Sequence, residues 1–177
     1  WKLAPSAARG LARLAGKLSD GASRARLTPW QRYEQAMAYY RRKRHRKAEP
    51  ALKAVLKASG VTPVLRCKAR YHLAKTVFRM RQRARAAPLY ARAVKACRST
   101  GDVDLVVKSL YNGAKGLSRA KKLPEAIARF GVIEREFRYH TYADDARLWA
   151  AELYQAMGKD RRAIKLLSSL PRRYPDG

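Results

Sequence analysis

Acidic residues are scarce in this sequence. The 177 residues contain 13 Asp and Glu against 41 Lys and Arg, a formal net charge of +28. Residues 1–100 carry 26 of the cations and three acids, an excess of +23, and the remaining residues carry 15 against 10, an excess of +5. Such a field attracts polyanions, including nucleic acid, acidic envelope polymers and anionic lipid headgroups. The alternative is a solvated basic surface that only keeps the protein soluble.

Long apolar segments are also missing. No run approaches the roughly 18–20 apolar residues that a helix needs to cross a bilayer, so we expect no transmembrane segment. The chain begins with Trp1, and no charged-then-apolar signal pattern opens it. We therefore expect that a targeting segment has been removed or that the sequence is a piece of a longer protein.

The residue patterns of common catalytic and cofactor sites are absent too. No glycine-rich turn ends in Lys-Ser or Lys-Thr, which argues against a nucleotide loop. His45, His72 and His140 share no ligand spacing with one another or with the two cysteines, so we expect no metal site. Glu134 and Glu136 fall on different faces of one predicted helix and form no acid–base pair. We find no catalytic constellation and expect no cofactor, and whether a parent protein is an enzyme stays open.

Alanine pairs twelve residues apart recur four times along the chain. The pairs are Ala36 with Ala48, Ala74 with Ala86, Ala114 with Ala126, and Ala151 with Ala163. Their first members lie 38, 40 and 37 residues apart, and a fixed period of this size indicates a repeat architecture. Such arrays usually build binding surfaces instead of catalytic pockets.

Each alanine pair marks two amphipathic helices, A and B, with the alanines where the helices cross. Residues three positions either side of the first alanine share its helix face; they are Tyr33 and Tyr39, Tyr71 and Val77, Tyr111 and Leu117, and Leu148 and Tyr154. The B stripe follows sixteen and nineteen residues after that alanine, at Leu52 and Val55, Tyr90 and Ala93, Phe130 and Ile133, and Leu167 and Leu170. We predict an all-α solenoid of about four helical hairpins, over residues 28–59, 63–98, 103–138 and 141–174.

Capping residues agree with these hairpins. Thr28, followed by proline and then by Gln31, predicts a capping box, and Thr62 is also followed by proline. Thr141 with Asp144 predicts a second capping box, and Gly158 the turn of the last hairpin. One further amphipathic helix, from Leu3 to Leu18, and a link are expected within residues 1–26.

The positions counted from the alanines resemble the tetratricopeptide pattern. The match consists of a small residue, an apolar or aromatic residue three later, alanine twelve later and a large apolar residue four after that, between Trp30 and Pro175. The sequence departs from the pattern where a large aromatic is usual early in helix A, at Arg32, Arg70, Leu110 and Arg147. The resemblance implies a divergent tetratricopeptide-like domain over residues 27–177.

Two cysteines fall at neighbouring ends of the second hairpin. Cys67 lies near the start of its A helix and Cys97 near the end of its B helix, and these ends meet in an antiparallel hairpin. A disulfide is one interpretation, and it implies an oxidising compartment. Two buried, reduced thiols that act as small hydrophobes are the alternative.

Repeats 2 and 3 share a basic stripe. It comprises Lys68, Tyr71, Lys75 and Arg79, and then Lys108, Tyr111, Lys115 and Arg119. Spacings of three, four and four keep each set on one face of helix A. In tetratricopeptide arrays that face lines the concave groove, so the resemblance implies a trough in which cations pair with carboxylates or phosphates and tyrosine faces contact sugars or bases. The alternative, which the sequence supports equally, is that the stripe is a solvated face without a ligand.

A second basic line follows the turns between the A and B helices. It runs through residues 41–47, through Arg81, Arg83 and Arg85, through Lys121 and Lys122, and through Lys159, Arg161 and Arg162. Turns of successive repeats stack along one edge of a solenoid, so these cations are expected to form a ridge. Exposed turns are commonly charged, and we interpret the ridge as a solvated edge.

Several segments together resemble the helical region of bacterial soluble lytic murein transglycosylases. They are residues 27–32, the hairpin from Cys67 to Cys97, Tyr142-Ala143-Asp144-Asp145-Ala146-Arg147, and Leu170-Pro171-Arg172-Arg173-Tyr174-Pro175-Asp176-Gly177. In that family the region precedes a lysozyme-like catalytic domain, whose glutamate has no counterpart in this chain. The resemblance implies a scaffold in the periplasm or cell envelope that holds peptidoglycan or another anionic polymer.

Three hypotheses therefore stand. The first is a non-catalytic scaffold, the peptidoglycan-associated part of a periplasmic lytic transglycosylase. The second is a stand-alone tetratricopeptide adaptor that binds an acidic peptide or partner protein. A nucleic-acid binder ranks third, and it requires steep salt dependence of binding.

Overall fold

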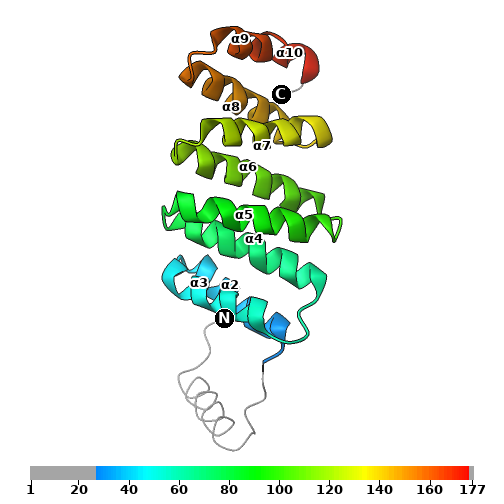
Figure 1. Ribbon diagram of the computed structural model, residues 1–177. Helices are drawn as coiled ribbons and strands as arrows, with labels where there is room; N and C mark the ends of the chain where they lie inside the picture. The colour runs from blue at the N-terminus through cyan, green and yellow to red at the C-terminus, as the bar shows by residue number, and fades with distance from the viewer. Residues whose placement is uncertain (1–26, 176–177) are drawn as a thin grey trace, which may run out of the picture.

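A computed structural model of the chain describes residues 27–175, which form a stack of helical hairpins (Figure 1). The helices are α2 (Pro29–Arg41), α3 (His45–Lys57), α4 (Pro63–Arg79), α5 (Arg83–Arg98), α6 (Val103–Arg119), α7 (Leu123–Glu136), α8 (Ala143–Ala156), α9 (Asp160–Ser168) and α10 (Leu170–Arg173). Over these residues the structure contains no strand. The predicted helix between Leu3 and Leu18 lies outside the described residues, and the division at residue 26 stays a prediction.

Each helix packs mainly on its neighbours along the chain. The pairs α2/α3, α4/α5, α6/α7 and α8/α9 are the four predicted hairpins, and the hairpins succeed one another from one end of the stack to the other (Figure 1). The expected all-α solenoid is confirmed. Among the described helices, none is both long enough and apolar enough to cross a membrane.

The alanine pairs lie at the core of this stack. Seven of the eight alanines are fully buried, and Ala163 is 4% exposed. Their small side chains allow the two helices of a hairpin to approach closely where they cross. Most of the predicted stripe residues are buried around them, including Tyr90, Phe130 and Ile133, so the period in the sequence corresponds to the period of the core.

The stripe fails in the fourth hairpin. Leu148 and Leu167 are 40% and 41% exposed, and of the described helices only the short α10 follows α9 and packs on α8 and α9. The inner side is filled instead by Arg147, whose buried guanidinium pairs with Glu134 of α7 and donates from Nε to the Leu166 carbonyl at 3.0 Å. A buried ion pair needs such additional hydrogen bonds to offset its desolvation.

The helix starts confirm two of the three threonine caps. The Thr28 hydroxyl accepts from the Gln31 N–H, and the Gln31 side chain accepts from the Thr28 N–H, which completes the capping box. The Thr62 hydroxyl accepts from the Leu65 N–H. The predicted box at Thr141 is wrong: α8 begins two residues later, at Ala143, and no side chain caps it. A tight turn through His140, whose Nδ1 accepts from the Tyr142 N–H at 3.2 Å, occupies that position instead.

Cys67 and Cys97 are joined by a disulfide bond in this structure. Cys67 lies in the second turn of α4 and Cys97 in the last turn of α5, and both residues are buried. Of the two interpretations left open by the sequence, the structure contains the covalent one.

Candidate functional site

The basic stripe lies on two A helices, α4 and α6, which contact each other. We call the eight residues of the stripe the A-helix face: Lys68, Tyr71, Lys75, Arg79, Lys108, Tyr111, Lys115 and Arg119. The two halves influence each other, because Lys108 of α6 is close enough to help lower the pKa of Lys75 of α4. The structure thus brings the predicted cations together.

The tyrosines of this face are buried, in contrast to the prediction that their rings contact sugars or bases. Tyr71 is 4% exposed and Tyr111 is 9% exposed. The Lys75 ammonium lies 5.4 Å from the centre of the Tyr71 ring, and the Lys115 ammonium 5.2 Å from that of Tyr111. The rings therefore act as supports that hold the two lysines by cation–π attraction, and no free tyrosine face remains for stacking.

Most cations of the A-helix face have no acidic partner. Lys108 is the exception, since its ammonium lies 2.7 Å from Asp104 and this hydrogen bond raises its pKa. Among the described residues, the other five cations of the face form no ion pair; they are Lys68, Lys75, Arg79, Lys115 and Arg119. A cluster of unpaired, like charges is a site that an anion stabilises.

Lys75 is the most constrained of these cations. Partial burial lowers its pKa, and the neighbouring charges of Arg79 and Lys108 lower it further. An anion placed beside Lys75 would relieve both the desolvation and the repulsion. This residue marks the centre of the A-helix face.

A group of aromatic residues beside Lys75 was missed by the sequence interpretation. His72 is surrounded by the rings of Tyr33, Tyr40 and Tyr71, with centroid distances of 5.8, 5.7 and 5.1 Å. Its Nδ1 lies 2.8 Å from the Tyr33 hydroxyl oxygen, which links repeats 1 and 2. Burial, with smaller contributions from Lys75, Lys68 and Arg41, lowers the pKa of His72 to about 4. The imidazole is therefore neutral at neutral pH.

Two tryptophans border the cations. The Lys68 ammonium lies 5.4 Å from the Trp30 ring centre, and the Lys115 ammonium 4.6 Å from that of Trp149. Trp149 and His72 occupy the same repeat position, two residues before the first alanine. The sequence could have predicted an aromatic contact at this position, because the position adjoins the stripe on the same helix.

The positive charge on the A helices ends at the fourth repeat. Asp145 and Glu152 stand on α8 where the cations stand on α4 and α6, and both are exposed. The Tyr111 hydroxyl donates to Asp145 at 3.5 Å, and burial together with this carboxylate raises the pKa of Tyr111 to about 12. The charge on the A helices thus changes from positive on α4 and α6 to negative on α8.

Larger cavities in the described chain lie away from the A-helix face. A cavity of about 470 Å³ is lined by Arg147, Tyr154 and neighbours in repeat 4, and one of about 520 Å³ by Leu27, Thr28 and neighbours in repeat 1. The predicted trough corresponds to neither. The A-helix face is therefore a charged surface suited to an extended ligand and not to a small enclosed molecule.

Comparisons with known proteins identify the fold. Residues 145–177 match the family model of the tetratricopeptide repeat. YrrB, a TPR protein with an unusual peptide-binding site, is similar in structure, with a TM-score of 0.63 and 20% identity over 96% of this chain and 78% of that one. BtubC from P. vanneervenii gives 0.68 and 16% identity over 95% and 72%, and MamA from AMB-1 gives 0.67 and 14% identity over 96% and 86%. No curated protein matches the sequence significantly.

These similarities show a tetratricopeptide-like helical-repeat fold, and at such low identities they show the fold alone. They give no support to the resemblance to lytic transglycosylases.

Proposed function

We propose that this chain is a non-catalytic adaptor whose A-helix face binds an acidic segment of a partner protein. The observation that carries the proposal is the group of five cations on that face without an acidic partner among the described residues. Charge-assisted hydrogen bonds to carboxylates are stronger than neutral ones. Helical-repeat solenoids present extended surfaces to such segments.

The lysines are positioned before a partner arrives. Lys75 and Lys115 are held over buried tyrosine rings, and Lys115 also over Trp149. Side chains that are already ordered lose less conformational entropy on binding. A carboxylate near Lys75 also offsets the repulsion from Arg79 and Lys108 that lowers its pKa.

The change of sign along the stack gives the bound segment a direction. Carboxylates of the partner would lie against α4 and α6, and neutral or basic residues against Asp145 and Glu152 of α8. Like charges placed opposite each other disfavour the reverse orientation. A segment with acidic residues at one end only is therefore the expected ligand.

A binding measurement on charge-reversed variants tests this proposal. The labelled probe is an Asp/Glu-rich peptide with a neutral tail, and the readout is fluorescence anisotropy. Lys75→Glu with Lys115→Glu should weaken binding by at least about tenfold. The control reverses Lys95 and Arg135, two exposed cations on B helices that form no ion pair among the described residues, and should change affinity by less than about threefold. Equal losses in both variants would contradict a specific face.

A scaffold in the cell envelope is the second candidate. The Cys67–Cys97 disulfide favours an oxidising compartment such as the periplasm. The resemblance at residues 170–177 to lytic transglycosylases supplies a candidate ligand, peptidoglycan. Co-sedimentation of the chain with purified peptidoglycan, retained at physiological salt and lost on reversal of Lys75 and Lys115, would favour this candidate.

Packing accounts for part of that resemblance. Ala143 and Ala146 are fully buried, and Arg147 pairs with Glu134, so three residues of the Tyr142–Arg147 motif serve the repeat itself. Residues 145–147 of this motif also lie within the tetratricopeptide match at residues 145–177. The adaptor therefore remains the better supported proposal.

A further inference from the structure

The turns between the A and B helices repeat one hydrogen-bonding pattern four times. In the first, the Lys43 N–H donates to the Tyr40 carbonyl and the Arg44 N–H to the Tyr39 carbonyl, at 3.0 and 2.9 Å. Corresponding bonds close the turns after α4, α6 and α8. This pair of bonds is the Schellman motif, in which the residue after the C-cap adopts the left-handed conformation.

That left-handed position holds a cation in three of the four turns. It is Lys43, Arg81 and Lys121, at φ of 58°, 62° and 62°, and Gly158 in the fourth turn, at 68°. Glycine is the usual residue there, because the Cβ of other residues approaches the following carbonyl oxygen. At the opposite edge of the stack, the left-handed positions are Gly60 and Gly101. Glycine therefore occupies left-handed positions at both edges, but at three turns of one edge a Lys or Arg adopts this strained backbone conformation instead.

The helix dipole does not explain this choice. Cations near a helix C-terminus are favourable, but α2, α4 and α6 already have Arg41, Arg79 and Arg119 in their last turns. That interaction does not require a cation at the strained position one residue beyond the C-cap. Departures from local preference are expected at functional sites, so a second role is indicated.

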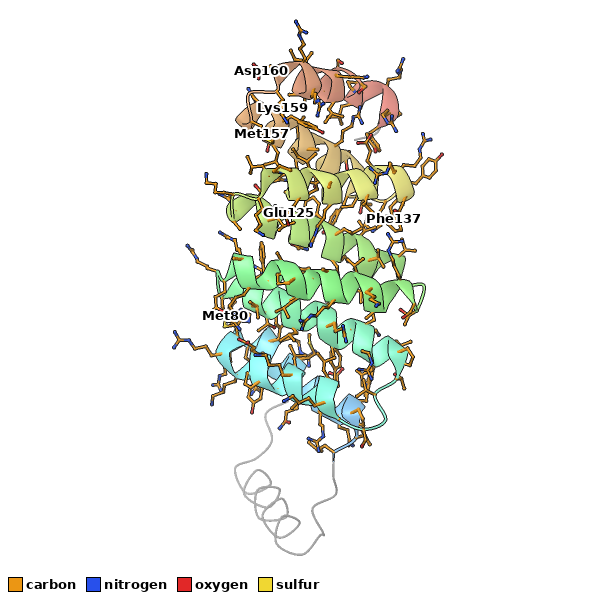
Figure 2. All side chains as sticks on the ribbon, in the orientation of Figure 1. Met80, Glu125, Phe137, Met157, Lys159 and Asp160 are labelled. Carbon is orange, nitrogen blue, oxygen red and sulfur yellow. A yellow bond between two sulfur atoms is a disulfide. The ribbon has the colours of Figure 1, made fainter. Side chains whose placement is uncertain are left out.

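The three strained cations are free to meet a ligand. Lys43, Arg81 and Lys121 are exposed and form no ion pair among residues 27–175. The turns lie along one edge of the stack, marked by Met80, Met157 and Lys159 at the left of Figure 2. Their flanking residues add further arginines and lysines, some of which pair with nearby acids, as Arg85 does with Glu49. We call this edge the turn ridge.

We propose that the turn ridge binds a linear phosphodiester polymer along the stack. Its cations follow one line, which suits an extended chain with a phosphate in every unit. Most of them are arginines, whose planar donors match phosphate oxygens. No large hydrophobic residue of the turns is among the exposed ones, so the ridge lacks the apolar anchors that strengthen binding to a membrane surface. This ridge is a surface distinct from the A-helix face.

Glycine variants separate ligand binding from structure. Lys43→Gly, Arg81→Gly and Lys121→Gly together remove three charges and relieve the strain. The probe is labelled oligothymidylate in fluorescence anisotropy with the full chain. We expect affinity to fall by at least about tenfold at 0.1 M salt, the salt-dependence slope to decrease by roughly 2, and the melting temperature to stay equal or rise. The control variant, Lys57→Gln with Lys95→Gln and Arg135→Gln, removes three charges from exposed positions on B helices and should lose less than about threefold.

Competition identifies the source of the phosphates. Poly(glycerol phosphate) should displace labelled oligothymidylate from the chain, whereas polyglutamate of equal charge should displace it poorly. The proposal is overturned if the unaltered chain does not bind, if both triple variants lose affinity equally, or if the glycine variant melts lower. Binding only to anionic vesicles would also overturn it. The glycine variant should keep its affinity for the acidic peptide, so that failure here leaves the adaptor function untouched.

Discussion

Arg129 of α7 reaches across α6 and donates a hydrogen bond from Nη1 to the Ala87 carbonyl of α5 at 3.3 Å. The side chain passes over Gly113, where an added Cβ would lie 2.6 Å from Arg129 Nη1 and 3.2 Å from the Tyr90 Cβ. Burial lowers the pKa of Arg129, which marks it as a partly desolvated cation. Repeats 2 and 3 are therefore linked through a gap that a glycine provides.

A larger side chain at Gly113 should destabilise the protein. Gly113→Val places two branches against Tyr90 and displaces Arg129, so we expect the free energy of unfolding to fall by roughly 1–3 kcal/mol. Urea denaturation followed by circular dichroism measures this change. The control is Gly131→Ala in α7, where the nearest atom is the far end of Arg135. That substitution should stabilise by about 0.5–1 kcal/mol, because alanine favours the helix; a loss comparable to that of Gly113→Val would contradict the argument.

Reduction of the Cys67–Cys97 disulfide should also destabilise the protein. The bond closes a loop with a sequence separation of 30 residues. Chain entropy predicts a loss of about 3–4 kcal/mol on reduction. The measurement is urea denaturation with and without reductant, together with a thiol count. In the Cys67→Ala, Cys97→Ala variant the reductant should have no effect, and two free thiols in the untreated protein would refute the bond.

Two glutamates of α7 should respond differently to the same substitution. Glu134 pairs with the buried Arg147, so Glu134→Gln leaves a buried cation uncompensated and should cost about 3 kcal/mol or more of unfolding free energy. Glu136 pairs with Arg98 at the surface, and Glu136→Gln should cost less than about 1 kcal/mol. Thermal and urea denaturation of both variants give the comparison. Similar losses would mean that Arg147 finds enough other partners.

His72 should make the protein less stable as the pH falls. Its pKa is lowered to about 4 in the folded chain, mainly by burial, while an unfolded histidine titrates near 6.5. Between these values the unfolded state binds more protons, so the free energy of unfolding decreases as pH falls from about 6.5 to 4. The contribution is on the order of 2–3 kcal/mol. Denaturation across this range should show a shallower slope in His72→Gln, and parallel curves would exclude His72 as the cause.

The periodic core could be predicted from the sequence. Alanines twelve residues apart and aromatic residues three positions away depend only on helix geometry, which is local. The same holds for the caps at Thr28 and Thr62, each of which involves residues within one turn. The capping box predicted at Thr141 was wrong because the neighbouring His140 closes the turn, and capping rules do not include such a contact.

The candidate site could be predicted from the sequence only in part. Helical spacing placed Lys75 and Lys115 on one face correctly, but it could not tell which side of each tyrosine ring would be covered by the next repeat. Trp149 and His72 were missed because they adjoin the stripe without sharing its residue type. The strain at Lys43, Arg81 and Lys121 is a backbone property with no marker in the side-chain pattern.

The sequence by itself determined the helices, their pairing into hairpins and the strong positive charge, because periodicity, capping and composition act over a few residues or over the whole chain. Only the tertiary structure decided which charges stay unpaired, as for Lys75, and which are buried in pairs, as for Arg147 with Glu134. Those outcomes depend on how successive repeats stack, because the residue of opposite charge lies 13 residues away for Arg147 and 36 residues away for Arg85.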